Sequence, residues 1–192
     1  VPPAGYLGRC AEICRAHDVL LIVDEVQTGL GRTGTMFAFE HDAIRPDGVC
    51  LGKALGGGLL PVSAFLGPEA VMQAFEPGDH GSTFGGNPLA CATARAALDV
   101  IVGEKLAERS DELGAYFMDR LKGIASRLVK EIRGRGLWIG IELHEAARPY
   151  CEALMRAGLL CKETHDRVIR IAPPLVILRE EIDWAVDRIA AV

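Results

Sequence analysis

The amino-terminal segment predicts a helix. Apolar side chains at Leu7, Cys10, Ala11 and Cys14 recur at the three- and four-residue spacing of one helix face. The polar pair His17–Asp18 follows them, and we expect the helix to end there. The chain therefore opens with a helix that has one apolar face.

Three short apolar runs predict strands of a sheet. The run Val19–Val23 is continuous and rich in branched residues, which is typical of a parallel strand covered on both faces, and it ends at the acidic pair Asp24–Glu25. Asp47–Gly52 and Val62–Leu66 predict two further strands, with glycine-rich turns between them. Helix, strand and loop alternate in the manner of an α/β protein.

The pattern changes after Pro88, where long helices follow. Leu89–Val102 is an alanine-rich helical stretch, and Glu104–Val129 predicts a second helix with charges on its outer face. We expect a domain boundary near residues 101–104, which divides the chain into unequal α/β parts at residues 1–102 and 103–192. Further strands are predicted at Gly136–Leu143 and Val168–Ile171, and further helices at Ala146–Ala157 and Arg179–Ala190.

Composition and charge narrow the classes of function. The chain is 49% hydrophobic and 24% charged, which is ordinary for a globular protein. The net charge of −5 leaves no broad basic surface for a nucleic acid or an anionic membrane. The apolar runs, such as Val19–Val23 and Leu59–Val62, are far shorter than the roughly 20 residues that span a bilayer. Small-molecule chemistry is the favoured class, without nucleic-acid or membrane partners.

The six cysteines are scattered through apolar segments and form no C-x-x-C pair. A reducing compartment fits such thiols best, which indicates the cytoplasm and leaves the mitochondrial matrix open. Cys10 and Cys14 would lie one helical turn apart, but no nearby His or Cys pair completes a metal site. We therefore expect buried thiols and no metal.

Two phosphate-binding motifs are imitated in the sequence, and neither fits. Gly29–Gly34 matches G-x-G-x-x-G, but residues 24–28 separate it from the preceding strand and Met36–Phe39 follows where a helix should begin. A flexible turn is the favoured interpretation. Gly52–Lys53 is no P-loop, because Ala54 stands where a Ser or Thr should bind magnesium.

An acid and an amine remain, each at the end of a predicted strand. Asp24 ends one strand and Lys53 follows another, and in open α/β sheets ligands bind outside the carboxyl ends of the strands. Pyridoxal phosphate needs a Lys amine for a Schiff base with its aldehyde and a carboxylate beside its pyridine nitrogen. From these two residues alone, a structural ion pair between Asp24 and Lys53 stays equally open.

Three ordered motifs decide between these interpretations. The chain resembles the class III aminotransferases of the type I pyridoxal phosphate fold through Asp24–Gly34, Gly52–Gly58 and His80–Pro88. The likeness continues to the carboxy terminus and covers nearly the whole chain. The blocks Lys162–His165 and Arg170–Ile177 most resemble ornithine aminotransferases.

The resemblance implies a role for each matching residue around the cofactor ring. Asp24 would hold the pyridine nitrogen, Val26 would pack on one face of the ring, and Gln27 would bind its phenolic oxygen. Lys53 would form the Schiff base and move a proton between substrate and cofactor. Glu25, next to Asp24 on the strand, should point to the opposite face.

The resemblance also implies contacts away from the ring. Ser82 and Thr83 would donate to the cofactor phosphate across the interface of a homodimer or higher homo-oligomer. Arg170 would clamp a substrate carboxylate, that of glutamate or 2-oxoglutarate. The fold implied is part of the large, mostly parallel-sheet cofactor domain, followed by a small carboxy-terminal α/β domain.

The activity implied is transfer of the δ-amino group of ornithine to 2-oxoglutarate. Acetylornithine and 4-aminobutyrate aminotransferases are the alternatives within the enzyme class, and a non-catalytic remnant or interaction domain is the alternative of another class. The opening Val1–Leu7 has no initiator Met and resembles a stretch from the middle of the family, so we expect a missing upstream segment and an inactive fragment.

Overall fold

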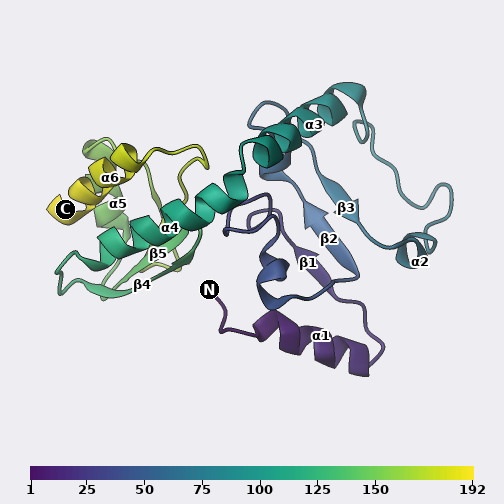
Figure 1. The fold of residues 1–192 in the computed structure, drawn as a ribbon, viewed down its shortest axis with the longest axis horizontal. Helices are drawn as coiled ribbons and strands as arrows, with labels where there is room; N and C mark the ends of the chain where they lie inside the picture. Colours follow the sequence, from purple (N-terminus) through teal and green to yellow (C-terminus); the bar gives the residue numbers. More distant parts are fainter. The chain divides into compact units, whose positions relative to one another are not determined.

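A computed structural model describes residues 1–192, and the chain divides into two units. The amino-terminal unit holds residues 2–31 and 35–106, and the carboxy-terminal unit holds residues 107–192 together with Val1 and residues 32–34. The division between Leu106 and Ala107 lies a few residues beyond the expected boundary. Both units are drawn in Figure 1.

The amino-terminal unit is built around a three-stranded sheet in the order β1-β2-β3. Strands β1 and β2 are parallel, whereas β2 and β3 are antiparallel. The unit therefore has an α/β architecture with a mixed sheet. Its elements in chain order are α1 (Tyr6–Ala16), β1 (Ile22–Asp24), η1 (Ala38–Asp42), β2 (Gly48–Leu51), η2 (Lys53–Gly56), β3 (Ala64–Leu66), α2 (Glu69–Met72) and α3 (Pro88–Gly103).

Strand β1 differs from the expectation of a strand covered on both faces. It begins only at Ile22, and its side chains alternate between exposed, buried and exposed. Val23 is 7% exposed, whereas Leu20 and Ile22 are 55% and 52% exposed. The prediction of two covered faces was wrong, because only the face that carries Val23 is buried and the face that carries Ile22 and Asp24 is exposed.

The carboxy-terminal unit is an antiparallel sheet in the order β4-β5-β7-β6 with helices on one face. Ile139, Ile141 and Ile169 alternate along β5 and β7 and pack with Phe117 and Ile182 of the helices in one apolar core. The elements in chain order are α4 (Leu106–Lys122), β4 (Val129–Arg135), β5 (Trp138–Leu143), α5 (Arg148–Arg156), β6 (Lys162–Thr164), β7 (Val168–Ile171) and α6 (Arg179–Ala191).

Most of the long predicted elements are confirmed. The helices α1, α3, α5 and α6 and the strands β2, β3, β5 and β7 lie where the hydrophobic pattern places them, within a few residues at their ends. Asn87 begins α3 by accepting a hydrogen bond from Ala90 N at 2.9 Å, and Pro88 occupies the first turn, where its missing N–H costs nothing.

The prediction that helix α4 extends to Val129 was wrong. The helix ends at Lys122, Gly123 follows, and Val129 instead begins β4. The sequence hid β4 because its outward positions are charged, so the strand shows little apolar alternation. β6 was also missed, since three residues give no periodic pattern.

The glycine-rich turn at residues 29–34 is held in place, which corrects the interpretation of it as flexible. Arg32 O accepts hydrogen bonds from Leu137 N at 3.1 Å and from Ser110 Oγ at 3.0 Å. The Arg32 guanidinium donates to the carbonyls of Leu137 and Pro173. Burial lowers the pKa of this guanidinium from its ordinary value. Residues 32–34 of the turn are thus a structural part of the carboxy-terminal unit.

Candidate active site

Asp24 and Lys53 follow neighbouring parallel strands at the same edge of the sheet. Asp24 is the last residue of β1 and pairs in register with Cys50 of β2, and Lys53 comes directly after β2 ends. Because parallel strands direct their carboxyl ends to one side, both side chains belong to the same edge. Both residues are exposed. An amine and a carboxylate are therefore accessible at this edge.

Lys53 has an unusual backbone. Its φ of +45° lies in the left-handed region, which costs a residue with a Cβ roughly 1–2 kcal/mol. The flanking residues Leu51, Gly52 and Leu55 are buried and fix the turn that imposes this conformation. Such strain persists only where surrounding structure enforces it, and it is concentrated at functional sites.

Asp24 and Glu25 point to opposite sides, as predicted. Asp24 is exposed, and its Oδ1 accepts a hydrogen bond from Val26 N at 3.0 Å. Glu25 is only 3% exposed and accepts hydrogen bonds from the Thr28 hydroxyl and from Phe39 N. The buried Glu25 thus anchors the loop that follows Asp24.

This anchoring role of Glu25 was missed in the sequence. The available signal was the spacing of Glu25 and Thr28, which suits a carboxylate that accepts a bond from a hydroxyl one turn later. Gly29 completes the loop, because a Cβ there would lie 2.9 Å from the Glu25 carbonyl oxygen. The loop after Asp24 therefore packs tightly against the end of β1.

Val26 lies beside the backbone that leads into Lys53. A Cβ placed on Gly52 would lie 3.4 Å from Val26 Cγ1, an ordinary van der Waals contact. Gln27 follows in the same turn and is exposed. The structure therefore brings Asp24, Val26 and Lys53 to one edge, with Gln27 in the adjoining turn.

No ion pair joins Asp24 to Lys53. Neither residue belongs to any of the ion pairs of the chain. The interpretation of the two residues as a purely structural pair therefore has no contact to support it. Both groups remain accessible to a ligand.

Ser82 and Thr83 lie in the loop before α3. Both are exposed, and Ser82 Oγ accepts a hydrogen bond from Gly85 N at 3.1 Å within the loop. No hydrogen bond or ion pair connects them to Asp24 or Lys53 of the same chain. The loop is built as a polar turn at the chain's surface.

Arg170 belongs to the carboxy-terminal unit. It lies in β7, where it pairs in register with Gly140 of β5 and Lys162 of β6. Residues in such a cross-strand row point to the same face of the sheet. Arg170 therefore shares a face with Lys162.

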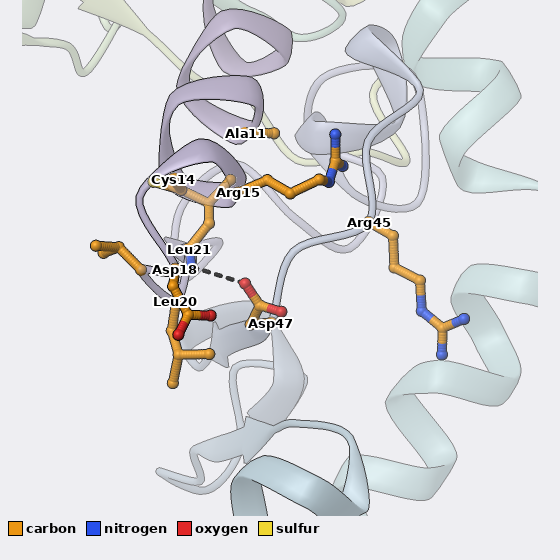
Figure 2. A pocket seen from close by; sticks show the side chains of 9 residues that line it. Ala11, Cys14, Arg15, Asp18, Leu20, Leu21, Arg45 and Asp47 are labelled. Carbon is orange, nitrogen blue, oxygen red and sulfur yellow. Dashed lines mark hydrogen bonds between the residues drawn. The ribbon is translucent and has the colours of Figure 1, made fainter.

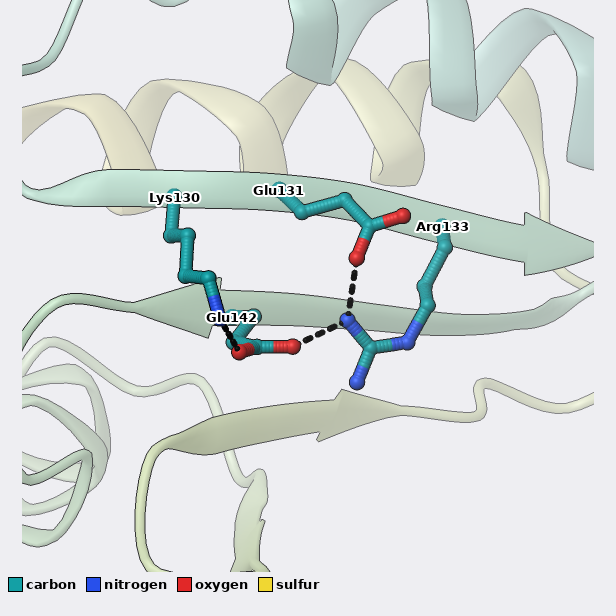
Figure 3. A network of polar contacts seen from close by, with 4 residues as sticks. All are labelled: Lys130, Glu131, Arg133 and Glu142. Carbon is teal, nitrogen blue, oxygen red and sulfur yellow. Dashed lines mark hydrogen bonds and ion pairs between the residues drawn. The ribbon is translucent and has the colours of Figure 1, made fainter.

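A charged network occupies the same sheet beside that row (Figure 3). Glu142 accepts hydrogen bonds from Lys130, at 2.6 Å, and from Arg133, which also binds Glu131 at 2.8 Å. The hydrogen bonds from Lys130 and Arg133 lower the pKa of the Glu142 carboxyl. The same contacts, led by that to Glu142, raise the pKa of Arg133. Each of the four charged side chains is therefore paired with an opposite charge within the network.

A pocket of about 190 Å³ opens at the other end of the amino-terminal sheet (Figure 2). It is lined by residues that precede β1 and β2, among them Leu21 and Asp47, whose carboxylate accepts a hydrogen bond from Leu21 N at 2.8 Å. Asp24 and Lys53 lie beyond the carboxyl ends of the same strands. This pocket is therefore not part of the candidate site.

The chain has no group of three or more His, Cys, Asp or Glu side chains that could hold a metal ion. None of its helices combines the length and the apolar character needed to cross a bilayer. The edge that carries Lys53 remains the candidate active site.

Comparison with known proteins identifies the family. The sequence profile of the aminotransferase class-III family matches residues 1–192. The chain belongs to the class-III aminotransferases. The resemblance of the motifs around Asp24 and Lys53 to this family is thereby confirmed.

Similar class-III aminotransferases are known by sequence and by structure. Ornithine aminotransferase 2 of Staphylococcus saprophyticus is 60% identical over 192 residues, which is 100% of this chain and 48% of that protein. An ornithine aminotransferase structure from Toxoplasma gondii, described with partial occupancy of PLP at its active site, has a TM-score of 0.96 and 49% identity. It is covered over 46% of its length by 100% of this chain.

An acetylornithine aminotransferase is also similar in structure. The enzyme of Elizabethkingia anophelis has a TM-score of 0.95 and 46% identity, with 100% of this chain covering 49% of that one. The chain thus spans about half the length of the class-III aminotransferases that it matches. These structures confirm the expected fold as part of a pyridoxal phosphate-dependent aminotransferase.

Proposed function

We propose that the protein carrying this sequence is a pyridoxal phosphate-dependent ornithine aminotransferase. The observation that carries the proposal is the position of Lys53 and Asp24 beyond the carboxyl ends of the parallel strands β1 and β2. The high identity to ornithine aminotransferases supports the choice of donor. The activity belongs to the complete protein, and the 192 residues alone are expected to turn over no substrate.

The residues at this edge fit the proposed cofactor. Lys53 offers an accessible amine for its aldehyde, and Asp24 offers a carboxylate for its pyridine nitrogen. Pyridoxal phosphate, when bound, supplies an electron sink for the bonds at the substrate's amino-bearing carbon. Val26 supplies an apolar surface beside Lys53, and Gln27 an amide for the ring's phenolic oxygen.

Lys53 has two tasks in the proposed reaction. Its amine would hold the cofactor through a covalent bond to the aldehyde carbon. The same amine would accept the proton from the amino-bearing carbon of the substrate and hold it for return in the second half of the transfer. The enforced turn at Lys53 fixes the backbone from which the amine extends.

Ser82 and Thr83 are proposed as donors to the cofactor phosphate of a neighbouring subunit in a homodimer or higher homo-oligomer. Their exposure and the absence of hydrogen bonds to Asp24 and Lys53 fit a role outside their own chain's site. The proposed domain roles follow: residues 1–102 belong to the large cofactor-binding domain, and residues 103–192 form the small carboxy-terminal domain.

Arg170 is proposed to bind a carboxylate of the acidic substrate, 2-oxoglutarate or glutamate. A guanidinium matches a carboxylate with two parallel N–H···O bonds, which a lysine cannot do. The acidic substrate is common to the ornithine reaction and to its acetylornithine alternative, so Arg170 does not discriminate between them. The 4-aminobutyrate alternative is kept as a third donor to test.

The donor is tested by single half-reactions of the complete protein. Ornithine, acetylornithine and 4-aminobutyrate are each added without a keto acid, and the loss of cofactor absorbance is followed. We expect ornithine to bleach the absorbance with the highest second-order rate constant. A higher rate constant for acetylornithine or 4-aminobutyrate would replace the proposed donor. No cofactor uptake by a well-folded protein would instead favour a non-catalytic remnant.

A further inference from the structure

Two cysteines of the carboxy-terminal unit are in contact between α5 and β6. Cys151 lies on α5 and is 5% exposed, whereas Cys161 directly precedes β6 and is half-buried. The Cys161 thiol donates a hydrogen bond to the sulfur of Cys151. Cys151 is part of the apolar core of this unit, and Cys161 packs against that core. Both are free thiols, so their sulfur atoms are available to one ligand.

The backbone of α5 and β6 supports this contact independently. The chain turns back after α5 at Gly158, which has a φ of +90°. Arg148 in the first turn of α5 forms an ion pair with Glu163 of β6 at 2.9 Å. Cys151 follows Arg148 at helical spacing, and Cys161 precedes Glu163 at the two-residue spacing of one strand face. The thiol pair therefore lies beside the ion pair, between the same two elements.

The thiol pair offers a metal ion two sulfur ligands and no third. The chain has no group of three or more His, Cys, Asp or Glu side chains that could hold a metal ion. Zinc needs four protein ligands in a structural site and three in a catalytic one, so this pair does not suit zinc. Thiolates select soft cations, and Hg(II) is a soft cation that prefers two sulfur ligands in a line.

The apolar surroundings also select the charge of the ion. Burial raises the pKa of both thiols, because a lone thiolate is poorly solvated there. Two thiolates and one divalent cation form a neutral unit, so binding buries no net charge. A monovalent cation such as Ag(I) would leave one negative charge in the same surroundings. The pair therefore fits a soft divalent cation.

We propose that Cys151 and Cys161 form a binding site for one soft divalent cation of the Hg(II) type, held by two sulfur atoms. With mercuric chloride as the source, two Hg–S bonds form while two Hg–Cl and two S–H bonds break. Two protons and two chloride ions are released, and nothing is oxidised or reduced. The bound ion joins α5 to β6, a strand at the edge of its sheet. This site is separate from the proposed aminotransferase function and needs neither Lys53 nor the cofactor.

The test uses the complete protein, reduced and then treated with equimolar mercuric chloride. A monothiol such as 2-mercaptoethanol, in about 10²-fold excess, then removes ions held by single cysteines, because two tethered ligands hold an ion more tightly by that factor or more. Trypsin cleaves after Arg156, between the two cysteines. We expect mass spectrometry to find one mercury ion that bridges the peptides containing Cys151 and Cys161.

Variants identify the ligands. Cys161→Ser and Cys151→Ala each remove one sulfur, so the mercury retained by the pair should fall at least about tenfold in either variant. Cys91→Ser is the matched control, because it removes an exposed thiol of α3, and it should retain as much mercury as the parent. Zinc chloride in place of mercuric chloride should leave no ion bridging the two peptides.

Three results would overturn the proposal. The parent could retain no mercury after the monothiol, or Cys161→Ser and Cys151→Ala could retain as much as the parent. Mercury confined to the peptide with Cys10 and Cys14 would instead assign the ion to α1. The bridged peptides are measured in the parent, so the result stands even if a variant fails to fold. A failure of transamination does not affect this test.

Discussion

At the scale of single residues, Lys53 is held in a backbone conformation that residues with a Cβ disfavour. A glycine would adopt its φ of +45° without cost, yet the chain has a lysine there. The neighbouring Asp24 is exposed at the end of a strand whose inner residue, Val23, is buried. Both positions expose a functional group on a fixed support.

Replacing Asp24 with Asn tests the carboxylate. The amide has the same shape but no charge, so it cannot stabilise a protonated pyridine nitrogen. We expect kcat of the complete protein to fall by at least about 10²-fold, as when one preorganised electrostatic group is removed from an active site. Single-turnover kinetics measure this fall. Unchanged kinetics would mean that another acid serves the ring.

At the scale of elements, the carboxy-terminal unit depends on a glycine contact between α4 and the turn from β4 to β5. A Cβ added at Gly114 would lie 2.2 Å from Gly136 O. Gly136 itself has a φ of +54°, and a Cβ there would lie 2.5 Å from the Thr33 carbonyl carbon. Helix, turn and the segment 32–34 therefore touch through bare backbone.

Gly114→Ala is expected to destabilise the carboxy-terminal unit by several kcal/mol, roughly 3 or more, because backbone must move to accept one methyl group. Chemical unfolding followed by Trp138 and Trp184 fluorescence measures the change. Gly103→Ala is the control, since a Cβ at that helical position meets nothing within 4 Å. A Gly114→Ala unit as stable as the parent would show that the contact is looser than described.

Two thiols of the same unit make its stability depend on alkaline pH. Burial and the neighbouring Cys151 raise the pKa of Cys161 from 9.0 to about 12, and burial also raises the pKa of Cys151. Because the folded pKa exceeds the unfolded one, the contribution to stability is complete below pH 9.0. It is lost as the pH rises from 9.0 towards 12.

Cys161→Ala should reduce the fall in the free energy of unfolding as the pH rises above 9.0. The measurement is the free energy of unfolding at several pH values above 8, with Cys91→Ala, an exposed thiol on α3, as the control variant. Alkylation offers a second measure, because only thiolates react quickly, and Cys161 should be slow at pH 8. Equal pH dependence in parent and Cys161→Ala would contradict the assigned cause.

At the scale of the whole molecule, the sequence predicts the positions of Asp24 and Lys53 at strand ends better than it predicts the packing. The apolar runs before Asp24 and Lys53 place both residues at strand ends, and glycine-rich turns confirm that the chain leaves the sheet there. Strand β4 could not be predicted from its own sequence, because it contains the charged residues Lys130, Glu131 and Arg133 and shows little apolar alternation. Its pairing with β5 is visible only in the structure. Local patterns therefore locate the parallel strands β1 and β2 and fail for the polar strand β4.

Long-range contacts could not be predicted in this way. The hydrogen bonds of Arg32 reach residues more than one hundred positions away, and nothing in the local pattern indicates them. The left-handed turn at Lys53 is equally invisible, because a lysine gives no sign of positive φ. Exposure of one face of β1 depends on which segments cover the sheet, which is a property of the whole unit.

The central claim is that Lys53 binds the cofactor covalently, and one measurement tests it directly. The complete protein is incubated with pyridoxal phosphate, reduced with borohydride, digested and analysed by mass spectrometry. The account predicts one stable adduct on the peptide that contains Lys53, and none on that peptide in a folded Lys53→Ala variant. An adduct confined to another lysine, or none in a well-folded parent, would contradict it.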